Sequence, residues 1–162
     1  RVSCFKKTHP DGRIVGTRGG QNWQILLPLY YYYDRYFLDE PLYNYVVYRS
    51  SHSQGDDTEE KQMYRCYEHE AIITETLSSM DMESNIRDRY IFETRIRYIR
   101  KRLRIAFLYH NRALVHELYE ILSKEKQSRS KEFTYALAIR NKYTYRLFGY
   151  IYVITRKIIG KQ

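Results

Sequence analysis

The sequence contains few of the residues that interrupt helices. Of its 162 residues, seven are glycine and three are proline, and none of them lies between positions 56 and 148. Glycine and proline are the residues that most destabilise a helix interior, so a stretch of 93 residues without either one favours helices. We therefore predict a mainly α protein, with a boundary at the polar loop 50–57.

Cysteines and long apolar runs are also scarce. The two cysteines, Cys4 and Cys66, provide no disulfide framework and favour a reducing compartment. No apolar run is long enough to span a bilayer, and no secretory signal is present. The sequence begins at Arg1, which fits removal of an organellar targeting peptide and equally fits a partial sequence. We expect an intracellular protein and, on the organellar interpretation, a mitochondrial one.

Motifs of the common enzyme classes are missing. The glycine-containing run 16–20 lacks the Lys-Ser/Thr pair of a P-loop and the spacing of a dinucleotide fingerprint. Four side chains are of the types that bind zinc: Cys4, His9, Cys66 and His69. The first two, however, do not have the spacing of a zinc knuckle, and no serine or cysteine has a companion motif for nucleophilic catalysis. We predict no enzymatic activity, no metal site and no cofactor.

The charge is plentiful but segregated. The net charge is +9 overall, with +3 on residues 1–55, −7 on residues 56–83 and +13 on residues 84–162. Arginine supplies twelve of the nineteen basic residues in the last segment, and its planar fork binds phosphate or carboxylate through two parallel hydrogen bonds. The acidic segment can neutralise only part of this excess. A partner that supplies negative charge is therefore expected.

The segment 85–126 has the apolar periodicity of one long amphipathic helix. Its apolar seam recurs in steps of three and four at Phe92, Ile96, Ile99, Leu103 and Ala106, and continues through His110 and Ala113 toward Leu118 and Ile121. A cationic stripe lies about 130° around the helix and consists of Arg97, Arg100, Lys101 and Arg104. We predict that this stripe contacts the phosphate backbone of RNA or DNA without base specificity.

Two shorter helices complete a predicted three-helix core within a helical domain, residues 56–162. The first begins with Asp56 or Asp57 as its N-cap, and its inner side is lined by Cys66, Ile73, Leu77 and Met80. The third follows a turn at 127–130, with Ser130 as a cap, and runs from Lys131 to at least Arg146. The apolar segment 147–159 is predicted to make a buried contact or to lie against a membrane surface.

The N-terminal region, residues 1–55, is basic and aromatic. We predict a flexible arm whose Arg13 and Arg18 also contact nucleic acid, followed by short strands at 23–27 and 42–48. Tyrosine is in excess, at 19 residues against six phenylalanines, and its half-polar ring suits interfaces. We predict that partner subunits dock on Trp23, Tyr30, Tyr31, Tyr32 and Tyr33.

These features lead to two hypotheses for the function. The first is a non-catalytic structural subunit of a large nucleoprotein assembly, either an organellar ribosome-like particle or a coat that packs nucleic acid. The alternative is an accessory subunit of a mitochondrial membrane complex, such as the respiratory chain or ATP synthase, that packs on partner subunits and lipid. Under both hypotheses the chain is an obligate member of a multi-subunit complex.

Overall fold

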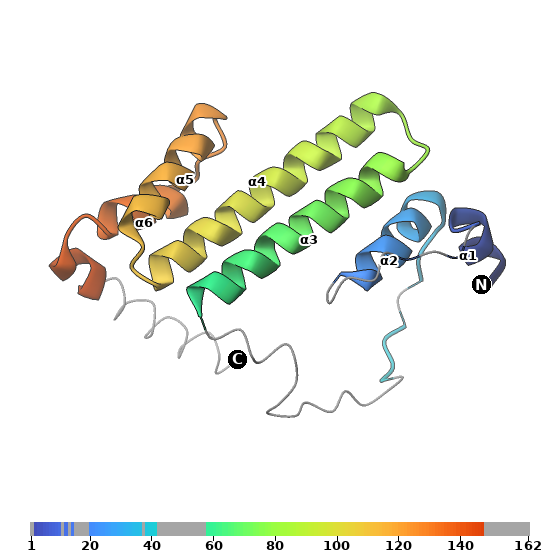
Figure 1. Ribbon diagram of the computed structural model, residues 1–162, viewed down its shortest axis with the longest axis horizontal. Coiled ribbons are helices and arrows are strands. Elements are labelled where there is room, and N and C mark those ends of the chain that lie inside the picture. Colours follow the sequence, from blue (N-terminus) through green and yellow to red (C-terminus); the bar gives the residue numbers. More distant parts are fainter. Residues whose placement is uncertain are drawn as a thin grey trace. The chain divides into compact units, whose positions relative to one another are not determined.

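The computed structural model describes residues 2–10, 12, 14, 20–36, 38–41 and 58–147. These residues are mostly helical and include no strand, so the mainly α prediction is confirmed (Figure 1). The helices are α1 (Val2–Thr8), α2 (Gln21–Tyr32), α3 (Glu59–Ser79), α4 (Ser84–Leu108), α5 (Arg112–Lys124) and α6 (Ser130–Ala138), and the described residues 142–147 are also helical. The chain forms two compact units, residues 1–95 and 96–162, which divide inside α4. The boundary predicted at 55 and 56 lies outside the described residues.

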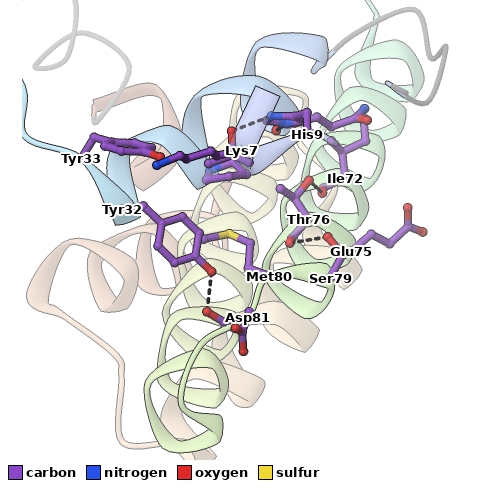
Figure 2. A pocket seen from close by; sticks show the side chains of 13 residues that line it. Lys7, His9, Tyr32, Tyr33, Ile72, Glu75, Thr76, Ser79, Met80 and Asp81 are labelled. Carbon is purple, nitrogen blue, oxygen red and sulfur yellow. Dashed lines mark hydrogen bonds between the residues drawn. The ribbon is translucent and has the colours of Figure 1, made fainter. Parts of the chain in front are cut away.

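The strand predicted at 23–27 is wrong, because this segment lies inside α2. The helix continues through Pro28, which has no N–H group and leaves the carbonyl of Gln24 without its helical donor. His9 replaces that donor, since its Nε2 atom lies 2.8 Å from the Gln24 oxygen (Figure 2). A contact from the end of α1 therefore compensates for a helix-breaking residue in α2. The strand predicted at 42–48 lies outside the described residues.

Gly20 starts α2 at a point of close approach to α3. Its φ angle is +80°, in the left-handed region that favours glycine, and a Cβ atom added there would lie 2.7 Å from Cδ1 of Ile72. Ile72 is buried on α3, which contacts α2. The glycine therefore serves both the backbone conformation and the packing of these two helices.

The first helix of the predicted domain corresponds to α3. Thr58 is its N-cap, and the Thr58 hydroxyl accepts a hydrogen bond of 3.3 Å from the N–H of Lys61. The predicted caps, residues 56 and 57, lie outside the described residues. The predicted inner side is confirmed, because all four residues are buried: Cys66, Ile73, Leu77 and Met80.

The predicted single helix over 85–126 is wrong, because the chain breaks between α4 and α5. His110 adopts a φ angle of 62°, and two hydrogen bonds close the end of α4 around it. The N–H of His110 donates to Phe107 over 3.2 Å, and the N–H of Asn111 donates to Ala106 over 2.9 Å. This is the Schellman arrangement of a helix C-terminus. The Asn111 side chain then starts α5 by accepting a 3.3 Å hydrogen bond from the N–H of Leu114.

The break divides the predicted apolar seam. Four of its members in α4 are buried as predicted: Ile96, Ile99, Leu103 and Ala106. Phe92 is half-buried, whereas His110 and Ala113 are exposed, because the chain leaves the helical register before it reaches them. Leu118 is buried as part of a different helix, α5.

Aromatic rings pack α4 against α6 and against the helical residues 142–147. Phe107 stacks on Tyr135 of α6 with the ring centroids 4.4 Å apart, and it also contacts Tyr145 at 5.1 Å. The Tyr145 hydroxyl donates to the carbonyl of Leu108 over 3.4 Å, and burial raises the pKa of this hydroxyl. The largest fully buried aliphatic side chains among the described residues of this unit are Leu103, Val115 and Leu122.

The predicted third helix over 131–146 is also interrupted. Helix α6 ends at Ala138 and has Arg129 rather than Ser130 as its N-cap. Helical structure resumes at 142, after Asn141, whose Oδ1 accepts a 2.9 Å hydrogen bond from the N–H of Tyr143. The Thr144 hydroxyl lies 2.8 Å from the carbonyl of Ala138 and donates to it. The finer prediction of a three-helix core stays a prediction.

The end of α5 has the same Schellman arrangement as the end of α4. Lys126 has a φ angle of 54°, and its N–H donates to Ser123 over 3.0 Å, while the N–H of Gln127 donates to Leu122 over 2.8 Å. We expect Lys126→Gly to raise the free energy of unfolding by about 1 kcal/mol, because glycine has no steric penalty in this conformation. Chemical denaturation would measure the change.

Lys124→Gly is the matched control for this prediction, since it makes the same substitution two residues earlier in an ordinary helical position. It should lower the free energy of unfolding by up to about 1 kcal/mol. Equal changes of the same sign at the two positions would contradict the assignment of Lys126 as the left-handed cap.

Candidate polyanion-binding surface

The second half of α4 is buried on all but one narrow side. Its buried residues are Ile96, Tyr98, Ile99, Arg102, Leu103, Ile105, Ala106 and Phe107. Three basic residues are exposed between them: Arg97, Lys101 and Arg104. Their spacing of four and three residues places them within about 60° of one another around the helix. We call these three residues the cationic row.

The three residues of the cationic row are exposed. In the described part of the chain, no ion pair joins Arg97 or Lys101 to an acidic residue. The Lys101 ammonium lies 5.6 Å from the centroid of the Tyr98 ring, which holds it beside the helix. At about 1.5 Å of rise per residue, the row extends about 10.5 Å along α4. It is therefore a short, rigid line of positive charge.

Arg100, the fourth member of the predicted stripe, has a structural role in the fold. Its side chain is 20% exposed, and its Nε atom lies 3.5 Å from Oε1 of Glu132, of which only 8% is exposed. The Nη2 atom donates a 2.6 Å hydrogen bond to the carbonyl of Gln127. Arg100 thus fastens α4 to the turn between α5 and α6.

Glu132 also caps α6. Its Oε2 atom accepts a 2.8 Å hydrogen bond from the N–H of Arg129, the N-cap residue, which is the glutamate half of a capping box. One carboxylate therefore caps a helix N-terminus and forms an ion pair with the guanidinium of Arg100. Sequence periodicity did not identify this role, because the two side chains meet only through the tertiary fold.

The structure describes only some of the N-terminal residues that were predicted to contact nucleic acid or partner subunits. Arg13 and Arg18 lie outside the described residues. The side chains of Trp23, Tyr30, Tyr31 and Tyr32 are 38–48% exposed, and Tyr33 is half-buried. The Tyr32 hydroxyl donates to the backbone carbonyl of Asp81. Burial raises the pKa of Tyr32, and the negative charge of Asp81 raises it further. Most of this cluster is thus available to a partner.

A pocket of about 800 Å³ lies among α1, α2 and α3 (Figure 2). Its walls carry both signs of charge, with Lys7 near the end of α1 and Glu75 on α3, above an apolar floor that includes Ile72 and Met80. Sequence periodicity does not predict this pocket, because its walls come from three separate segments of the chain. The mixture of charges selects no single class of ligand.

The described ranges show no candidate metal cluster and no membrane-spanning helix. Among these residues, no cluster of three His, Cys, Asp or Glu side chains is placed to hold a metal ion. None of the helices in the same ranges is both long and apolar enough to cross a bilayer. The segment 148–159, predicted to make a membrane or buried contact, lies outside the described residues.

Comparison with known proteins gives no relative from which a role could be transferred. No protein-family model matches the sequence, and neither a curated protein nor a solved structure matches the chain. The charge and geometry of the surfaces themselves are therefore the basis for a function.

Proposed function

We propose that the protein is a non-catalytic structural subunit of a nucleoprotein assembly, and that it binds the phosphate backbone of RNA or DNA through the cationic row. The observation that carries this proposal is the exposure of Arg97, Lys101 and Arg104 in one line on α4. The surrounding charge supports it, since residues 96–147 contain thirteen basic and four acidic side chains. Arg100 is not part of the proposed contact, because it pairs with Glu132.

The dimensions of the row suit a phosphate backbone. Duplex DNA carries about one negative charge per 1.7 Å of axis, so a row of about 10.5 Å lies beside about six phosphate charges. Three cations can neutralise three of them without contacting a base. Such contacts fix position on the nucleic acid and carry no sequence information.

The exposed aromatic residues of α2 support contacts with protein neighbours in the same assembly. Tyr30 is 48% exposed and stacks under Arg35, whose guanidinium carbon lies 5.1 Å from the ring centroid. Tyrosine and arginine are enriched in the buried centres of protein interfaces. We place neighbouring subunits on this side of α2 and nucleic acid on α4.

The test is the salt dependence of binding to a generic RNA or DNA duplex, measured by fluorescence anisotropy. Three neutralised phosphates predict a slope of log K against log salt of about −2.7, and so about a 40-fold loss of affinity between 50 and 200 mM salt. A neutral-backbone analogue of the same sequence is the control and should not bind. Absence of binding at 50 mM salt, or equally tight binding of the neutral analogue, would contradict the proposal.

A further inference from the structure

Helix α3 has an exposed face that is opposite in charge to the cationic row. Its buried residues, which include Ile72, Ile73 and Leu77, occupy one arc of the helix. The opposite arc carries three glutamates and two tyrosines: Glu60, Tyr64, Tyr67, Glu68 and Glu75. Their spacing follows the helical repeat, so they form one stripe along α3. We call this set the α3 stripe.

The chemistry of the α3 stripe suits arginine and lysine. Tyr64 is 68% exposed and Tyr67 is 54% exposed, so both residues contribute to the surface of α3. Glu60 and Glu75 are exposed and Glu68 is half-buried along the same line. Carboxylates pair with guanidinium groups, and tyrosine faces attract cations. A cationic helix with the same spacing is therefore a matching partner.

The protein itself supplies such a helix. Glu68 and Glu75 stand seven residues apart on α3, as Arg97 and Arg104 do on α4, and each pair therefore spans about 10.5 Å along its helix axis. We propose that the α3 stripe of one copy docks on the cationic row of a second copy. Glutamates then face arginines, and Tyr64 and Tyr67 fill the space between the charged pairs.

This contact joins two different surfaces of the same chain. The residues of the α3 stripe lie in 1–95 and those of the cationic row lie in 96–147, so each copy carries one surface of each kind. The docking uses the same cationic row as the proposed function. A polyanion and a second copy consequently compete for Arg97, Lys101 and Arg104. Added nucleic acid should therefore dissociate the self-associated protein.

A charge exchange tests the docking. The full chain is freed of nucleic acid with nuclease and high salt, and its association is measured by sedimentation velocity at 50 mM salt. The wild type should self-associate. Glu68→Arg/Glu75→Arg alone and Arg97→Glu/Arg104→Glu alone should each associate at least about tenfold more weakly, because like charges then face one another. An equimolar mixture of the two variants should regain association.

Asp81→Arg/Glu83→Arg is the matched control, because it makes the same change in net charge at exposed positions outside the α3 stripe. It should associate as the wild type does. A monomeric wild type, or a mixture of the two variants that stays monomeric, would overturn the docking. Circular dichroism confirms that each variant retains its helices.

A parallel binding assay keeps this inference separate from the proposed function. Glu68→Arg/Glu75→Arg leaves the cationic row unchanged, so it should bind duplex nucleic acid at least as tightly as the wild type does. If this variant binds nucleic acid but the charge exchange fails, only the docking is wrong. If the charge exchange succeeds but the wild type does not bind nucleic acid, the docking stands and the proposed function fails.

Discussion

Replacing all three residues of the cationic row with glutamine is expected to weaken binding of duplex RNA or DNA by about 500-fold at 0.1 M salt. Arg97, Lys101 and Arg104 are exposed on α4, and each neutralised phosphate contributes about 0.9 to the slope of log K against log salt. The slope should therefore fall in magnitude by about 2.7. Fluorescence anisotropy over a salt series measures both quantities, and the change should be similar for unrelated sequences.

The matched control removes three basic side chains elsewhere in the same unit. Lys124, Lys131 and Arg140 are exposed and lie outside the cationic row, so their replacement by glutamine makes the same change in net charge. This variant should lose only a small part of the affinity, through weaker long-range attraction. If it loses as much as the row variant, binding reflects overall charge and the cationic row is not the site.

The sequence predicts the helices better than it predicts where they end. The absence of glycine and proline over 56–148 correctly indicated a helical region. The same absence hid two helix ends, because His110 and Lys126 take the left-handed position in which glycine is usual. Asn111 was the available signal, since asparagine is a favoured N-cap, and its side chain does cap α5.

The candidate site could also be predicted only in part from the sequence. Helical periodicity alone places Arg97, Arg100 and Arg104 on one side of α4. It cannot show that Arg100, at the edge of that side, meets Glu132 of α6, because this contact depends on the turn between α5 and α6. Pro28 is a parallel case, since the Gln24 carbonyl that it leaves without a helical donor contacts His9, the residue after α1.

The second large effect is expected at Glu132. Its carboxylate contacts Arg100 through one oxygen and the N–H of Arg129 through the other. Glu132→Gln should lower the free energy of unfolding by about 3 kcal/mol, near the lower end of the range for removing one partner of a buried ion pair. The guanidinium of Arg100 then stays in a poorly solvated position without its counter-charge. Chemical denaturation measures the loss.

Glu120→Gln is the matched control, because Glu120 is exposed on α5 and the substitution removes the same charge. It should change stability by less than about 0.5 kcal/mol. If Glu132→Gln is no more damaging than this control, the carboxylate does not fasten α4 to α6.

Replacing both Arg100 and Glu132 with apolar residues tests whether the loss of stability comes from an unpaired buried charge. Arg100→Met/Glu132→Leu should recover much of the stability lost in Glu132→Gln, because apolar side chains leave no buried charge unpaired. The double variant keeps the cationic row unchanged, so it should bind duplex nucleic acid within about threefold of the wild type. That range allows for loss of the long-range attraction of a single charge. A larger loss would place Arg100 on the phosphates, and the α4 contact would then contain four cations rather than three.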